Sequence, residues 1–265
     1  MGRARPHPGL AAVTRPRPAA TAAHADRRSP IPEEFSAMPT TPDPHHLTYD
    51  STAAWLLRFA ATAESVEPEL TALDQRAGDG DFGTNLTGGM AGVRRALETL
   101  SDAPAADRGS PAVPLATAAR VFLDDVGGTS GPLFGLLLQE LAAAVAANPA
   151  TAGTRELAAG TTAGAAAIQR VGEAEVGDKT LVDALVPAAR ALTACAQDTE
   201  PGQALHRAAV AAHQGARSTT DLRARRGRAS YTGDHARGVP DPGAMAIALL
   251  FASYDDALSA LNHLP

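Results

Sequence analysis

Three aspartates in a short glycine-rich stretch are the residues of this sequence best suited to chemistry. The stretch runs from Asp74 through Asp79 and Asp81 to Asn85. Carboxylate oxygens that converge at short range suit a hard divalent cation such as Mg²⁺, and without a cation they repel one another. An EF-hand does not fit, because Gly83 stands where a third ligand would follow Asp79 and Asp81. The alternative is an ordinary turn in which Asp81 caps the next helix.

A second stretch, from Gly127 to Gly135, leads into a strongly apolar segment. Glycine-rich turns at a helix start present backbone amides to an anion, and Thr129 and Ser130 add hydroxyl donors. The stretch is not a Walker A loop, because no lysine follows Gly131, and it is not a nucleophile elbow. It predicts either a phosphate cradle or the close packing of two helices through glycines.

A third stretch, Gly177–Asp183, contains Lys179, the only lysine among the 23 basic residues. Asp178 is well placed to cap a helix that begins here. A surface pair between Lys179 and Asp183, one helical turn apart, is the structural alternative to a functional role.

A fourth stretch is a cluster of arginines, Arg225, Arg226 and Arg228, followed by Asp241 and Gly243. Arginine side chains bind phosphate oxygens through two parallel donors, so the cluster predicts a phosphate contact, for which we single out Arg228. The alternative is a solvated surface loop.

These four stretches fall between segments in which Ala and Leu recur at helical spacing. The sequence predicts eight helices and no strand, with the helices near 50–72, 85–100, 112–125, 131–147, 154–171, 179–197, 202–222 and 243–262. Short connections between helices of similar length favour an all-α, antiparallel up-and-down bundle. In such a bundle the loops after the first, third, fifth and seventh helices share one rim, and the four stretches lie in those loops.

Composition limits what the chain can be. Its 265 residues are 45% hydrophobic, which allows one domain with a core plus a tail. No apolar run is long enough to cross a membrane, and the single Cys195 excludes an internal disulfide and a cysteine-based zinc site. We therefore expect a cytoplasmic protein. The net charge of −6 argues against nucleic acid as the main partner.

The first 47 residues differ from the rest. They contain 9 of the 20 prolines and six arginines, and they include a single aromatic residue, Phe35. We expect residues 1–47 to be a disordered extension and residues 48–265 to be the folded domain. Met38 is a natural alternative start.

In order and spacing, the four stretches resemble the nucleotide-binding L subunit, or L domain, of dihydroxyacetone kinases, over about Thr48 to His263. The resemblance implies an eight-helix barrel with ADP or ATP at one rim. Two Mg²⁺ ions would be held by Asp74, Asp79 and Asp81, which with Arg228 would be the catalytic residues. The residues it places around the nucleotide are Phe82, Gly83, Thr84, Asn85, Thr129, Ser130, Gly172, Leu181, Arg228, Asp241, Pro242 and Gly243.

The resemblance also implies an activity: phosphoryl transfer, through the bound nucleotide, to dihydroxyacetone held on a separate K subunit. The donor is either ATP or a phosphoprotein of the phosphotransferase system. Phe82 stands where phosphotransferase-linked relatives often carry His, so the usual indication of the donor is missing. The alternatives are a non-catalytic, ADP-binding regulatory module and a kinase domain for another short ketose or a fatty acid. Fatty-acid kinases share the first stretch but not the fourth.

Overall fold

The structure, a computed structural model, describes residues 43–102, 108–227, 230 and 236–265. The described residues contain no strand, and residues 41–265 group into one compact unit. The α-helices are α1 (Tyr49–Ala77), α2 (Phe82–Ser101), α3 (Ala112–Asp124), α4 (Ser130–Ala147), α5 (Thr154–Gly172), α6 (Val182–Thr193), α7 (Pro201–Ser218) and α9 (Pro242–Ala252). Two short 3₁₀ helices, η2 (Thr219–Asp221) and η4 (Leu261–His263), follow α7 and α9.

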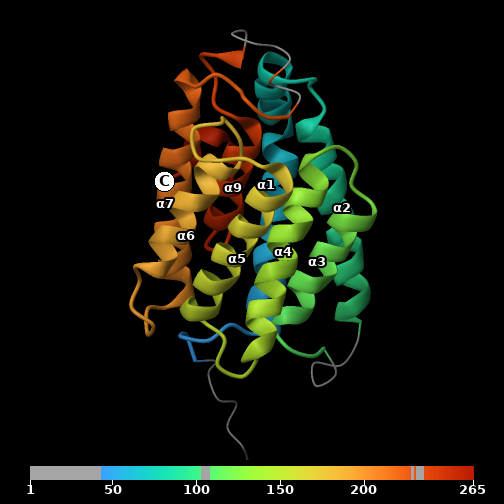
Figure 1. The fold of residues 1–265 in the computed structure, drawn as a ribbon. Helices are drawn as coiled ribbons and strands as arrows, with labels where there is room; N and C mark the ends of the chain where they lie inside the picture. The colour runs from blue at the N-terminus through green and yellow to red at the C-terminus, as the bar shows by residue number, and fades with distance from the viewer. Residues whose placement is uncertain (1–42, 103–107, 228–229, 231–235) are drawn as a thin grey trace, which may run out of the picture. The chain divides into compact units, whose positions relative to one another are not determined.

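The helices run up and down and close into a barrel. Each packs against the next in chain order, and α9 packs against α7 on one side and α1 on the other. The loops after α1, α3, α5 and the segment after α7 therefore lie at the same end, the upper end in Figure 1. The predicted eight-helix antiparallel architecture is confirmed.

Local sequence signals explain where the first helix begins. Thr48 and Ser51 form a capping box, in which the Ser51 amide donates to Thr48 Oγ1 at 3.0 Å and the Thr48 amide donates to Ser51 Oγ at 2.9 Å. This pairing satisfies amide groups that have no partner within the helix. Leu47, which precedes the cap and belongs to the expected tail, is only 3% exposed and packs in the core.

The last α-helix differs from the prediction in its length. Every residue of α9 from Pro242 to Phe251 is buried, as expected for a helix that is apolar on all sides. The expected helix near 243–262 is wrong in its second half, because α9 ends at Ala252. There the Arg58 side chain donates to the carbonyls of Ser253 and Tyr254, which replaces further helical hydrogen bonds.

Helix α6 also begins later than predicted, at Val182 rather than near residue 179. The carboxylate of Asp183 accepts hydrogen bonds from the amides of Gly177 and Thr180 at 2.6 and 2.8 Å. These bonds hold the preceding residues as a loop, and the loop reaches over the end of the barrel.

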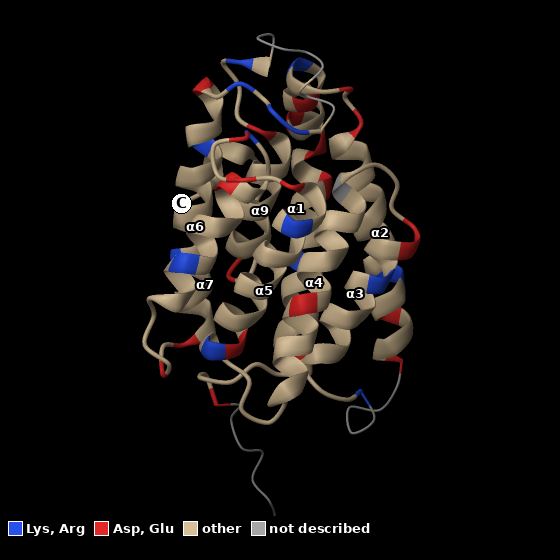
Figure 2. Ribbon diagram, in the orientation of Figure 1, with Lys and Arg blue, Asp and Glu red and all other residues tan. Residues whose placement is uncertain are grey.

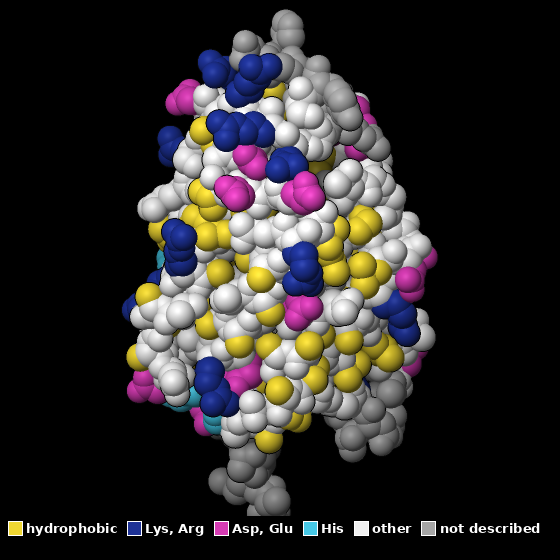
Figure 3. Space-filling view, viewed as in Figure 1, with side chains coloured by type: hydrophobic (Ala, Val, Ile, Leu, Met, Phe, Trp, Pro, Cys, Tyr) yellow, Lys and Arg dark blue, Asp and Glu magenta, His cyan; other side chains and the backbone are white. Residues whose placement is uncertain are grey.

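None of the described helices combines the length and the hydropathy needed to cross a bilayer. Many charged residues lie toward the upper end of the barrel, whereas the helix flanks facing the viewer carry few of them (Figure 2). In the space-filling view, acidic and basic side chains lie close together over this end (Figure 3).

Candidate functional site

A pocket of about 180 Å³ opens at the rim where the four loops meet. Residues from the α1–α2 loop, the α3–α4 loop, the α5–α6 loop and the segment before α9 all contribute to it. The lining residues are Asp74, Ala77, Gly78, Asp79, Asp81, Phe82, Thr129, Leu133, Ile168, Gly172, Ala174, Lys179, Thr180, Leu181, Val182, Arg226, Gly227, Asp241, Pro242 and Gly243. The barrel thus brings together stretches that are up to 169 positions apart, from Asp74 to Gly243.

Asp74, Asp79 and Asp81 converge at one edge of this pocket. One carboxylate oxygen from each lies within 4.8 Å of the other two. Asp74 is buried near the end of α1, whereas Asp79 and Asp81 are exposed on the loop that follows. Three carboxylate oxygens at this spacing, two of them open to solvent, fit Mg²⁺, which takes oxygen ligands and keeps some of its water.

The start of α2 is capped by Asp74 and not by Asp81. The amide of Phe82 donates to Asp74 Oδ2 at 3.0 Å, and the Asp81 side chain makes no capping hydrogen bond to the helix. The alternative in which Asp81 serves as a helix cap is therefore wrong. The cap instead orients Asp74 toward the other two carboxylates.

Several helix starts face the same pocket. Phe82 opens α2, Val182 opens α6 and Pro242 opens α9, and all three residues line the pocket, as does Thr129 just before α4. The positive end of the helix dipole favours anions at such positions, whereas the amides of Phe82 and Val182 already donate to the side chains of Asp74 and Thr180, and Pro242 has no amide hydrogen. Leu133, a partly buried hydrophobic residue, joins them on the lining beside the carboxylates.

Lys179 is the buried cation of the site. Its side chain is 1% exposed, and Nζ donates to the carbonyls of Thr219 at 2.5 Å and Val239 at 2.6 Å. Burial lowers the pKa of Lys179, while the nearby carboxylates of Asp241, Asp183 and Asp221 act to raise it. The alternative of a pair between Lys179 and Asp183 along a helix is wrong, because Lys179 lies before the start of α6 and both residues are buried.

Asp241 caps α9 and also lines the pocket. Its Oδ1 accepts from the Ala244 amide at 2.7 Å, and its own amide donates to Thr219 Oγ1 at 2.7 Å. Burial raises the pKa of Asp241 to about 7, despite the opposing effects of the Ala244 amide and of Lys179. Burial thus brings the pKa of Asp241 close to neutral pH.

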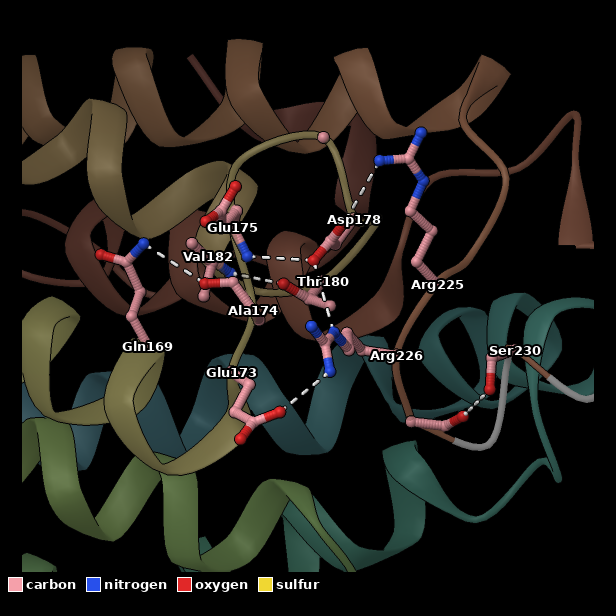
Figure 4. A network of polar contacts seen from close by, with 12 residues as sticks. Gln169, Glu173, Ala174, Glu175, Asp178, Thr180, Val182, Arg225, Arg226 and Ser230 are labelled. Atoms are coloured by element: carbon pink, nitrogen blue, oxygen red, sulfur yellow. Dashed lines mark hydrogen bonds and ion pairs between the residues drawn. The ribbon is translucent and has the colours of Figure 1, made fainter.

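Arg225 and Arg226 contact residues of the α5–α6 loop (Figure 4). Arg226 pairs with Glu173 at 3.5 Å and, through Nε, with Asp178 at 3.6 Å, while Arg225 contacts the other Asp178 oxygen at 3.6 Å. Asp178 also accepts from the Glu175 amide at 3.0 Å, so it braces its own loop and does not cap α6. Arg226 lines the pocket, whereas Arg228 lies outside the described residues.

Most of the nucleotide and metal residues predicted from the sequence meet at the pocket. Those on its lining are Asp74, Asp79, Asp81, Phe82, Thr129, Gly172, Leu181, Asp241, Pro242 and Gly243. Ser130 is the first residue of α4 at the same rim. Gly83, Thr84 and Asn85 are in the first turn of α2 but not on the lining.

Gly83 and Thr84 face α1 instead. A Cβ on Gly83 would lie 2.6 Å from the Glu67 carbonyl oxygen, so only glycine allows the two helices to approach this closely. Thr84 Oγ1 donates to Glu67 Oε1 at 3.1 Å. The structural alternative for the second stretch, close packing of two helices through glycines, also holds in part, because a Cβ on Gly135 of α4 would lie 2.7 Å from Leu123 Cγ of α3.

Sequence reasoning did not assign Lys179 or Arg226 to the site. The signal for Lys179 was present, since a single lysine survives in a chain that otherwise uses arginine. Arg226 carries no signal that separates it from Arg225, and only the folded loop distinguishes them. The apolar residues Leu133 and Ile168 also line the pocket, but in sequence they look like any other helical core residues.

Comparison with known families gives a match to the DAK2 domain over residues 76–256. The chain is 38% identical over 206 residues to L-erythrulose 1-kinase of Mycolicibacterium smegmatis, an alignment that covers 78% of this chain and 35% of that protein. It is 37% identical over 187 residues to the ADP-binding subunit DhaL of a PEP-dependent dihydroxyacetone kinase of Listeria innocua, with 70% and 83% covered.

Among solved structures, the fold is similar to that of the dihydroxyacetone kinase from C. freundii in complex with AMP-PNP and Mg²⁺. The TM-score is 0.59 at 24% sequence identity, and the match covers 91% of this chain and 37% of that one. The chain therefore spans about a third of the multidomain relatives and most of the length of the separate ADP-binding subunit.

Proposed function

Because the chain belongs to the DAK2 domain family, we propose that it is the component of a kinase that binds Mg²⁺ and ADP or ATP for phosphoryl transfer to a short ketose. The observation that carries the proposal is the convergence of three carboxylates at the edge of a pocket rimmed by helix starts. Such a pocket places metal ligands beside the N-terminal ends of helices, whose dipoles favour the negative charge of nucleotide phosphates.

In this proposal Asp74, Asp79 and Asp81 hold two Mg²⁺ ions. Bound Mg²⁺ neutralises phosphate charge and aligns the transferred group. The protein then supplies placement: the first residues of α2, α6 and α9 bind around the phosphates, and the apolar residues of the lining receive the base. Asp74 is held for this task by the Phe82 amide, so its position does not depend on the loop alone.

The ketose is proposed to be held by a separate K subunit that docks at this rim. The similarity to an ADP-binding subunit that is separate from its partners supports this arrangement. The similarity to an erythrulose kinase supports a substrate class of short ketoses, with dihydroxyacetone as its smallest member. The phosphoryl donor is ATP itself or a phosphotransferase-system phosphoprotein that recharges bound ADP.

The test is a two-step measurement. Calorimetry of the purified chain with ADP, with and without MgCl₂, should show binding that depends on Mg²⁺. Addition of a dihydroxyacetone-binding K subunit, with either ATP or phosphoenolpyruvate plus the phosphotransferase proteins, should then yield ketose phosphate with one of the two donors. Failure to bind ADP in the presence of Mg²⁺ would refute the proposal. Binding without transfer from either donor would favour the ADP-binding regulatory module instead.

A further inference from the structure

Lys179 sits at the tip of the α5–α6 loop in a conformation that side chains rarely adopt. Its φ is 60°, in the left-handed region, and its side chain is 1% exposed. Left-handed backbone is costly for residues other than glycine, asparagine and aspartate, and burial of an ammonium group costs more. The chain nevertheless has lysine at this position, whereas its other 22 basic residues are arginine. The contacts of Lys179 must therefore offset the free-energy costs of its backbone conformation and of its burial.

The ammonium group joins two segments that are far apart in the sequence. Its acceptors are the carbonyl of Thr219, in η2 directly after α7, and the carbonyl of Val239, shortly before α9. The carboxylates of Asp241, Asp183 and Asp221 surround the same group. Lys179 thus links three loops at the rim through one charged side chain.

Both acceptor residues are connected to Asp241, which is part of the pocket wall. The Thr219 side chain, which is 0% exposed, donates to the Ala216 carbonyl at 2.6 Å and accepts from the Asp241 amide at 2.7 Å. Val239 is two residues before Asp241, and Asp241 begins the run of lining residues that includes Gly243. The position of this wall is therefore determined by the same groups that bind Lys179.

Hydrogen bonds also fix the loop that carries Lys179. Asp183, which is 2% exposed, accepts from the amides of Gly177 and Thr180 on either side of the loop tip. The Arg225 amide donates to the Asp178 carbonyl at 3.0 Å, which adds a second tie between this loop and the segment after α7. Hydrogen bonds therefore hold the backbone on either side of Lys179 in place.

We infer that Lys179 is a positioning residue for the nucleotide site, holding the Asp241–Gly243 wall against the α5–α6 loop through its bonds to Thr219 and Val239. This inference rests on the proposed function. A compact ammonium donates in tetrahedral directions to two carbonyls and leaves a third proton for a carboxylate, whereas the planar guanidinium of arginine is larger and donates as a fork. The requirement is therefore for lysine and not for positive charge in general.

The test compares Lys179→Ala and Lys179→Arg with a control, Arg190→Ala. Arg190 is an exposed cation in the last turn of α6 and lies outside the pocket lining. We expect both Lys179 variants to bind ADP with Mg²⁺ about 10- to 100-fold more weakly, as is typical when groups that orient a site are removed. The control should bind as the unmodified chain does.

Two further measurements separate positioning from general stability. Addition of n-propylamine, which replaces the atoms removed in Lys179→Ala, should restore binding, whereas n-propanol should not. Hydrogen exchange without nucleotide should rise in residues 236–245 of both variants and stay unchanged in α3 and α4. Lys179→Arg keeps the positive charge, so it remains a test if Lys179→Ala does not fold.

Wild-type affinity in Lys179→Arg would overturn the inference, and so would an exchange increase spread evenly over the barrel. Loss of binding in Lys179→Ala that propylamine leaves unchanged would also overturn it. Absence of Mg²⁺-dependent ADP binding by the unmodified chain would count against the proposed function. In that case the exchange measurement on the nucleotide-free protein still decides whether Lys179 holds this wall.

Discussion

At the scale of single residues, the site concentrates carboxylates. Asp74, Asp79 and Asp81 bring oxygens within 4.8 Å of one another at one edge of the pocket, and Asp241 lines the same pocket with a pKa raised by burial. Like charges at such distances disfavour the ionised state unless a cation is present. In the proposed function, a bound cation offsets this repulsion.

Asp79→Asn should abolish Mg²⁺-dependent ADP binding, because it removes one of three converging ligands. The melting temperature without metal should stay the same or rise, since repulsion within the cluster is relieved. Calorimetry measures the binding of ADP, and thermal melting measures the stability without metal. Asp124→Asn is the control, an exposed carboxylate at the end of α3 that is not on the pocket lining. An Asp79→Asn variant that binds normally would make the cluster an ordinary acidic turn.

Asp241→Asn should change how stability depends on pH. The pKa of Asp241 is raised to about 7 in the folded protein from an ordinary value of 3.8, so between these values the folded state holds a proton that the unfolded state has lost. This group therefore makes stability fall as the pH rises from about 4 to about 7, and then no further. Asparagine keeps an acceptor for the Ala244 amide and does not titrate.

The measurement is urea unfolding of both proteins from pH 4 to pH 8. The variant should gain stability relative to the unmodified chain as the pH increases, with the difference levelling off above about pH 7. A difference that is constant over the whole range would show that Asp241 titrates near its ordinary value.

At the scale of elements, the close approach of α2 to α1 places the carboxylates. Gly83 lies against the Glu67 carbonyl, and the first residue of α2, Phe82, donates its amide to Asp74. The solvent-exposed side of α2 is less constrained, because nothing lies within 4 Å of a Cβ built on Gly88. Two glycines of one helix thus have different structural roles.

Gly83→Ala should destabilise the protein by about 1–3 kcal/mol, because the added methyl group has no space between α1 and α2. Gly88→Ala in the same helix should leave stability unchanged or raise it by up to about 1 kcal/mol, since alanine favours the helix. Chemical denaturation of both variants measures this. Equal effects would show that α1 and α2 are not packed through Gly83.

The helix boundaries show what an element's sequence can and cannot predict. Helices α3 and α4 were predicted to within one residue, because their ends follow local signals such as Asn148 and Pro149. The starts of α6 and the end of α9 were wrong, since they depend on bonds to the Asp183 carboxylate and to the Arg58 side chain. Asp183 holds the residues before α6 as a loop, and Arg58 belongs to another helix, α1.

At the scale of the whole molecule, the closed ring of helices brings the four stretches to one rim. Up-and-down connection places alternate loops at the same end, and the packing of α9 against both α7 and α1 closes the barrel. Among the described residues, the core begins at Leu47, whose amide donates to the Ala152 carbonyl at 2.7 Å. The α4–α5 loop, which contains Ala152, lies at the lower end in Figure 1, opposite the end at which the loops after α1, α3 and α5 lie.

Deletion of residues 1–37 should leave the melting temperature and the affinity for ADP unchanged. These residues lie outside the described part of the chain, and the expectation rests on their composition, which is rich in proline and arginine and poor in core-forming residues. Thermal melting and calorimetry of the shortened chain check it. Further removal of residues 38–47 is the contrast, because it takes away the buried Leu47 and should lower the melting temperature. A large loss on the first deletion would contradict the expectation.

The sequence by itself determined the helical class, the alternation of helices and loops, and the grouping of three carboxylates. Helical spacing of Ala and Leu and glycine-rich breaks are local signals, and Asp74, Asp79 and Asp81 are close in the chain, so their meeting needs only a tight loop. Only the tertiary structure decided which cation is buried, how Arg226 differs from Arg225, and that Asp74 and not Asp81 caps α2. Those outcomes depend on contacts such as that between Lys179 and Val239, which are 60 residues apart. No local pattern encodes such a contact, because it forms only when the barrel closes and removes both groups from water.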